Sequence, residues 1–330
     1  MNDALQIVDT RYAGDQQAFW WPRATVTMTT VAKNAVLVID GVKKQTTVTT
    51  IDTDKPLQPR QATPTPDENP VTIDGRLIVP QDVMVYKEVN PRDFEQHWNA
   101  VDLSKVLLAR ELPATGAAFI TSQVLRRSFQ YLDQCLWQGS TAYQGAVSKT
   151  DSRYQLQFFD GFIKLMLNDS AVVQVPAVST FSTSNLLGFM QTAISSTDTF
   201  LLANPAKYER LKFVMNPKSK VIFDQALSIG TTYKNDNYMV KGQNYFQGYE
   251  VIELYGVPDN TFVFGEFLAD GTGNFAIGMN AYEDMQLELM RLQNNSEMWF
   301  VKGLMKMAVN YGWGAQIVLA TTLTTSSFVA

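Results

Sequence analysis

The residue types that most often carry catalysis are scarce in this sequence. His97 is the only histidine and Cys135 the only cysteine among 330 residues. A nucleophile activated by an imidazole would have to use His97, and Cys135 falls in a helical pattern that would bury it. The same counts exclude zinc sites built from Cys and His clusters. Glu283 and Asp284 are adjacent and would point to opposite sides of a strand, so they make a poor acid–base pair. We interpret His97 as a packing or turn residue.

Two loop motifs resemble ligand sites but lack the context that such sites need. The segment GTGNFA at 271–276 fits a glycine pattern typical of dinucleotide binding. It leads into a strand-like stretch, so a phosphate would meet no helix N-terminus, and we predict a tight turn. Asp270, Thr272 and Asn274 alternate as calcium ligands can, but no glutamate closes the loop. We therefore expect no catalytic residue, no cofactor and no metal.

The bulk composition is that of an ordinary globular protein, with 45% hydrophobic and 18% charged residues. The length allows two lobes. A formal net charge of −5 disfavours a dedicated DNA-binding protein, so any contact with nucleic acid should be weak, sequence-independent and sensitive to salt. We expect neither a signal peptide nor a membrane span, because no apolar run of about 18 residues exists.

The first ninety residues have the pattern of strands separated by a polar loop. Residues 1–34 are rich in threonine, show little helical periodicity and are predicted to be an extended arm. The runs 35–51 and 73–89 are rich in β-branched residues, and 57–70 between them contains four prolines. We predict a hairpin with an exposed tip, which either projects from the body or forms an edge of a compact sheet. An isolated ribbon is marginally stable, so a projecting hairpin would have to pack on another molecule.

The rest of the chain predicts one long helix, an α+β lobe and late strands. Apolar residues recur at spacings of three and four over 116–138, a stretch bracketed by a proline and a glycine. Residues 156–270 alternate helical and strand patterns. Strand patterns at 274–279 and 297–319 follow, and we expect these late strands to pack on the long helix.

The order of these elements resembles the major capsid proteins of tailed bacteriophages, whose HK-ninety-seven-like capsid fold is shared with encapsulins. The resemblance is carried by FVMNPKSKVIFDQAL at 213–227, GYEVIELYGVPDNTFVFGE at 248–266, and NFAIGMN at 274–280 followed by EMWFVKGLMKMAVNYGWGAQIVL at 297–319. No single motif is diagnostic, because this family is recognised by the order of its elements. The resemblance covers most of the chain.

The resemblance implies an α+β fold with four parts. They are an N-terminal arm (1–34), an extended β-hairpin loop (35–92), a peripheral domain (93–155 and 271–330) with a spine helix over 116–138, and an axial domain (156–270). It also implies a structural protein and not an enzyme.

As a capsid protein, the chain would self-assemble into hexamers and pentamers of an icosahedral shell in the host bacterial cytoplasm and reside in the virion. Its partners would be other copies of itself, a portal, scaffold or decoration proteins, and weakly bound double-stranded DNA, with no membrane. Two alternatives stay open: an encapsulin-like nanocompartment, and an enzyme with a histidine-independent site in the 156–270 lobe.

Six residues are candidates for contacts between subunits, four charged side chains of the hairpin region and two tryptophans of the arm. Ordinary solvated charges, worth about 0 to 1 kcal/mol each, are the competing interpretation of the former. The six are Lys43, Lys44, Arg60, Arg76, Trp20 and Trp21.

Overall fold

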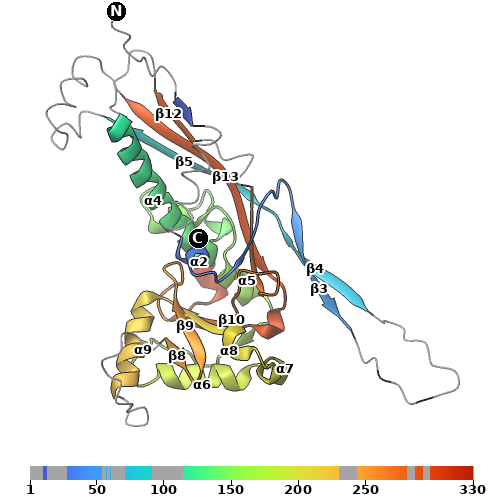
Figure 1. Ribbon diagram of the computed structural model, residues 1–330. Coiled ribbons are helices and arrows are strands. Elements are labelled where there is room, and N and C mark those ends of the chain that lie inside the picture. Colours follow the sequence, from blue (N-terminus) through green and yellow to red (C-terminus); the bar gives the residue numbers. More distant parts are fainter. Residues whose placement is uncertain are drawn as a thin grey trace, which may run out of the picture.

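The computed structural model describes residues 10–12, 28–53, 57, 60, 71–90, 114–229, 244–280, 287–292 and 298–329 (Figure 1). These residues form two mixed sheets, a separate two-stranded hairpin, and helices that pack on the sheets. The hairpin leaves the body on one side and points away from both sheets (Figure 1).

The first sheet is built around one long strand, β13. Alternate residues of β13 are buried along most of its length, because successive side chains of a strand point to opposite faces. The strand order is β1 (Thr10–Tyr12), β12 (Leu287–Arg291), β13 (Trp299–Tyr311), β11 (Phe275–Met279) and β2 (Leu37–Ile39), and β5 (Gln81–Val89) also pairs with β13.

The long helix α4, Ala114–Gln138, packs on the buried face of this sheet together with α5, Phe162–Asn168. Leu125, Phe129 and Leu132 of α4 are buried at spacings of three or four, which places them on one helical face. The helix predicted over 116–138 is confirmed and begins two residues earlier. The expectation that late strands pack on it is confirmed for β13.

The second sheet is buried on both faces. Phe213 and Met215 of β7 pack in a cluster with helices α6 (Leu186–Ser196) and α9 (Pro217–Ile229), whereas Val214 joins the core that contains α4. Burial on both faces explains why these strands have continuous apolar runs. The strand order is β6 (Val173–Gln174), β14 (Val318–Thr321), β10 (Thr261–Glu266), β7 (Leu211–Met215), β9 (Tyr249–Glu253) and β8 (Tyr245–Phe246).

Short elements connect these layers. They are α2 (Thr29–Ala32), α7 (Thr199–Ala203), α8 (Lys207–Arg210) and the 3-10 turns Thr141–Tyr143, Ser152–Leu156, Gly314–Gln316 and Thr325–Phe328. Within the described part of the chain, no helix is both long and apolar enough to span a membrane.

The projecting hairpin is narrower than the predicted 35–92. It consists of β3, Thr46–Asp52, paired with β4, Thr72–Ile78. The neighbouring strand β2 pairs with β11, and β5 pairs with β13 over nine residues, so both belong to the first sheet. Strand periodicity indicates which face a residue occupies but not which strand lies beside it, so the sequence could not separate these pairings.

Two further predicted boundaries are corrected by the structure. Residues 28–34 were assigned to the arm, but Met28 and Thr30 are fully buried around α2. Residues 271–330 were assigned to one domain, but β14 lies between β6 and β10 in the second sheet. The apolar run of β14 is compatible with either sheet, and only long-range packing selects one.

Candidate assembly surface

The β3–β4 hairpin has two chemically different faces. Directly opposed residues of an antiparallel pair point to the same side, so the register assigns each residue to a face. The inner face, directed to the body, carries Thr46, Val48, Thr50, Asp74, Arg76 and Ile78. The outer face carries Thr47, Thr49, Ile51, Ile73, Gly75 and Leu77 and contains no charge.

The outer face exposes large apolar side chains. Ile51 is 63% exposed, its cross-strand partner Ile73 is 69% exposed, and Leu77 is 49% exposed. A two-stranded ribbon buries too little surface to be stable alone, and clustered exposed apolar residues mark interaction sites. The outer face is therefore a candidate surface for contact with another molecule.

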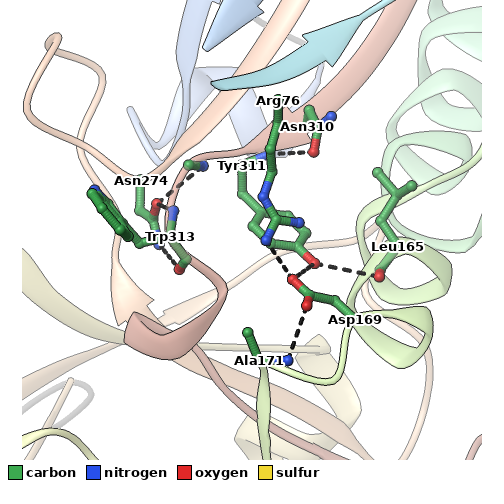
Figure 2. A network of polar contacts seen from close by, with 9 residues as sticks. Arg76, Leu165, Asp169, Ala171, Asn274, Asn310, Tyr311 and Trp313 are labelled. Atoms are coloured by element: carbon green, nitrogen blue, oxygen red, sulfur yellow. Dashed lines mark hydrogen bonds and ion pairs between the residues drawn. The ribbon is translucent and has the colours of Figure 1, made fainter. Parts of the chain in front are cut away.

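The inner face is tied to the body by a partly buried ion pair near the hairpin base (Figure 2). Arg76 Nη2 lies 2.6 Å from Asp169 Oδ2, and the guanidinium carbon lies 4.4 Å from the ring centroid of Tyr311. The Tyr311 hydroxyl donates to Asp169 Oδ2 at 3.0 Å, and the Ala171 amide donates to Asp169 Oδ1 at 2.9 Å. Three separate segments of the chain meet at Asp169.

The electrostatics of this cluster favour the ionised carboxylate. Partial burial opposes ionisation of Asp169, but the hydrogen bonds from Ala171, Arg76 and Tyr311 outweigh it and lower the pKa of the carboxyl group. Burial, followed by the nearby Asp169 charge, raises the pKa of Tyr311. The phenol therefore stays protonated and keeps donating to Asp169 at neutral pH.

Two further contacts hold the hairpin base. Asn310 Nδ2 donates to the Leu77 carbonyl at 2.9 Å. Ile78 is buried against Gly278, where an added Cβ would come within 2.7 Å of the isoleucine Cγ2 atom. The lack of a side chain at Gly278 thus permits the close approach of β4 to β11.

The predicted contact residues lie in different parts of the chain, and some fall outside the described residues. Trp20 and Trp21 lie outside the described residues, as does His97. Lys43 and Lys44 are exposed in the loop between β2 and β3, and Arg60 is exposed beyond the strands of the hairpin. Their roles in subunit contacts stay predictions.

Arg76 has an intramolecular role that the sequence analysis missed. It lies on the inner face and pairs with Asp169, 93 positions away in the sequence. Strict alternation with Ile78 could have placed Arg76 on the buried side of β4. No local signal could have identified Asp169 as its partner.

The two loop motifs around residues 270–276 form hydrogen bonds within the subunit. Asp270 accepts hydrogen bonds from the Thr272 amide at 3.0 Å and hydroxyl at 2.6 Å, which makes the predicted tight turn before β11. Asn274 turns away from this loop, because its Oδ1 atom accepts from the amides of Gly312 and Trp313. Among the described residues, no group of three or more His, Cys, Asp or Glu side chains could hold a metal.

Cys135 is fully buried in α4, as predicted, and burial raises the pKa of its thiol to about 12. A thiol with such a pKa is protonated at neutral pH and is a poor nucleophile.

Replacing Asn274 by alanine should destabilise the subunit by about 1 to 3 kcal/mol, because the partly buried Trp313 amide would lose its acceptor. The Gly312 amide and the Trp313 carbonyl would each lose one of two hydrogen bonds. Urea unfolding of the unassembled subunit measures this loss. The matched control is Thr272→Ala in the same loop, where the side chain is exposed and the loss should be smaller. Equal losses in both variants would contradict the assigned role of Asn274.

Neither protein-family models nor curated protein sequences match this chain. Solved structures do match it over most of its length. A chain of the satellite phage P4 procapsid that includes the size determination protein is 8% identical, with 93% of this chain and 99% of that chain covered and a TM-score of 0.53. The capsid of an empty GTA particle is 15% identical, with 89% and 97% covered and a TM-score of 0.53. This chain has the HK-ninety-seven-like capsid fold.

A third capsid agrees with this assignment. The capsid of Myoviridae phage XM1 is 12% identical, with 89% of this chain and 92% of that chain covered and a TM-score of 0.53. At identities this low, the structural similarity establishes a shared fold and nothing more specific. The matches confirm the predicted α+β class and the predicted capsid fold.

Proposed function

We propose that this chain is the major capsid protein of a tailed bacteriophage, a subunit that builds an icosahedral shell from hexamers and pentamers around double-stranded DNA. The observation that carries the proposal is the outer face of the β3–β4 hairpin. It is apolar, uncharged and exposed, and it lies on a ribbon that is firmly attached at its base in a chain with the capsid fold. Such a face gains stability only when another molecule covers it.

Packing of the outer face on a second copy of the chain explains why the hairpin exposes apolar side chains. Closed shells use many modest interfaces, because each contact can reverse during error correction while several neighbours together hold a subunit firmly. In this proposal the hairpin is the extended loop, the first sheet with α4 is the peripheral domain, and the second sheet, with β14 included, is the axial domain. The chain has no enzymatic role.

The partners follow from the same proposal. They are other copies of the chain, a portal, and scaffold or decoration proteins, within a virion assembled in the bacterial cytoplasm. The net charge of −5 is consistent with weak contact to packaged DNA, in which salt-sensitive phosphate contacts dominate. Tight DNA binding would impede both packaging and release.

Sedimentation velocity of the purified protein, with negative-stain electron microscopy of the fractions, tests shell formation. Rings or closed shells are the expected result. A monomer or dimer that stays small with scaffold protein or crowding agents would refute the proposal.

Nuclease treatment of particles from the native host tests their content. Protected double-stranded DNA is expected. A protected protein cargo without DNA would instead favour an encapsulin-like compartment.

A further inference from the structure

The hairpin contacts the body along its inner face from Ile78 to Thr50. Thr50 and Ile78 are buried and the Arg76 guanidinium pairs with Asp169, whereas Asp52 and Thr72, the last pair on the inner face, are exposed. The distal ends of both strands are therefore free of the body, and the hairpin points away from the sheets (Figure 1).

Small changes at this base would produce large displacements further out. Seven residues of β4 span about 23 Å at about 3.3 Å per residue, so a rotation of about 10° at the base moves the distal end by about 4 Å. Apolar contacts require heavy atoms within about 4 to 4.5 Å. The direction of the hairpin must therefore be fixed closely if its outer face is to meet a partner.

Among the base contacts, the Arg76 cluster provides the most directional restraint. Apolar packing of Ile78 is non-directional, whereas a guanidinium that pairs with a carboxylate and stacks on a ring is constrained in position and in plane. Asp169 follows α5, and Tyr311 ends β13, so the restraint joins the hairpin to two other elements (Figure 2).

A glycine closes the remaining side of this cluster. An added Cβ at Gly314 would lie 2.4 Å from Asp169 Oδ2 and 3.2 Å from Arg76 Nη2. The backbone of the turn Gly314–Gln316 therefore packs directly on the ion pair. The ion pair thus lies between β4, β13, the end of α5 and this turn, and is partly exposed.

We infer that Arg76, Asp169 and Tyr311 form a latch that sets the direction of the hairpin in the free subunit, before any neighbour is bound. Arg76 is the positioning residue, and its release frees the hairpin to swing about residues 43–45 and 79–80 while the body stays folded. A hairpin held in one direction has already lost its orientational freedom, so binding to a neighbour does not carry that entropic cost. The value of the latch for assembly rests on the proposed function, whereas its existence in the free subunit does not.

Electron–electron double resonance on the unassembled full chain tests the latch. Spin labels at Thr49→Cys on the outer face and Ser195→Cys on α6 report the hairpin direction, and both positions are exposed. The native Cys135 is fully buried and is spared by the labelling reagent. Dilution with unlabelled protein removes distances between subunits.

The variants are Arg76→Gln, Arg76→Lys and the matched control Lys212→Gln. Lys212 pairs with Glu250 at 3.0 Å in the second sheet, with side-chain exposures of 15% and 34%, against 33% and 16% for Arg76 and Asp169. Wild type and Lys212→Gln should give one narrow distance peak. Arg76→Gln should lose that peak and give a broad distribution, and Arg76→Lys, which keeps charge but not the planar stack, should be intermediate.

A narrow, unshifted peak in Arg76→Gln would overturn the latch. So would broadening that accompanies loss of the body fold, which circular dichroism and the urea midpoint detect. Shell assembly gives a second readout, since Arg76→Gln should raise the critical concentration roughly tenfold, the equivalent of about 1.4 kcal/mol. If wild-type protein forms no shells, the proposed function fails while the resonance result still decides the latch.

Discussion

Replacing Ile51 and Ile73 by aspartate should abolish shell formation and leave the subunit folded. The two side chains are cross-strand partners on the outer face and are 63% and 69% exposed. Substitutions at exposed positions usually change the free energy of unfolding by about 0.5 kcal/mol or less, and the repulsion between the two facing carboxylates, about 0.2 to 1 kcal/mol, acts within the hairpin. A contact between subunits would instead have to bury two unpaired carboxylates, which costs several kcal/mol for each hairpin.

The measurement is sedimentation velocity under conditions in which wild type assembles, with urea unfolding to verify the fold. The matched control replaces Ile51 and Ile73 by valine, which keeps both side chains apolar and β-branched and should keep assembly. Shells of normal size from the aspartate variant would show that the outer face is not buried between subunits.

A shortened hairpin provides the complementary test. Deleting residues 41–75, the central part of the predicted loop 35–92, would remove the buried Val42 and Thr50 and damage the body. Joining Asp52 to Thr72 through Asn-Gly, a pair suited to two-residue hairpin turns, removes the tip alone. Loss of closed shells with an unchanged unfolding midpoint is expected. Normal closure would locate the intersubunit contact on the strands and not at the tip.

Replacing Asp133 by alanine should destabilise the subunit by about 2 to 5 kcal/mol. Asp133 lies on α4, is 1% exposed, and accepts hydrogen bonds from the amides of Thr29 at 3.1 Å and Thr30 at 3.2 Å. It also accepts one from the Thr29 hydroxyl. Alanine would leave both amides of α2 without a partner and a small cavity beside them.

The same junction connects the α2 region to the second sheet. The Thr29 hydroxyl oxygen accepts from the Tyr255 amide at 2.9 Å, and the Thr30 hydroxyl oxygen accepts from the indole of Trp137 at 2.9 Å. Disruption of Asp133 should therefore lower the stability of the whole subunit. Urea unfolding measures the loss, and Asp198→Ala, which removes the exposed cap of α7, is the control with an expected loss of about 1 kcal/mol.

The pH dependence of Asp133 provides a separate test. Burial raises the pKa of this carboxyl group despite the hydrogen bonds from Thr29 and Thr30, so the folded state binds its proton more tightly than the unfolded state. The corresponding stability is present below the unfolded pKa of about 3.9 and is lost as pH rises through the raised folded pKa. Wild type should therefore lose stability as pH rises from about 4, whereas Asp133→Asn, which has no titrating group at this position, should not. The excess stability of wild type over Asp133→Asn should shrink accordingly. A difference that grows with pH would contradict the assigned direction.

The sequence by itself predicted the long helix, the strand-rich regions and their order along the chain. The spacing of apolar residues over 116–138 predicted α4, because one buried face of a helix requires that period. The alternating patterns over 156–270 predicted a mixed lobe of helices and strands, which contains β7 and β10. The order of the elements led to the capsid fold, which depends on that order more than on particular residues.

The tertiary structure alone decided which elements lie together. Nothing local distinguishes β14 from a strand of the first sheet, or β5 from a strand of the hairpin. Arg76 pairs with Asp169, which is 93 positions away in the sequence, and Asp133 accepts a hydrogen bond from Thr29, which is 104 positions away. The spacing of apolar residues in a segment determines which face of its helix or strand each side chain occupies. Which segment packs on that face depends on the packing of the whole chain, and no local segment encodes it.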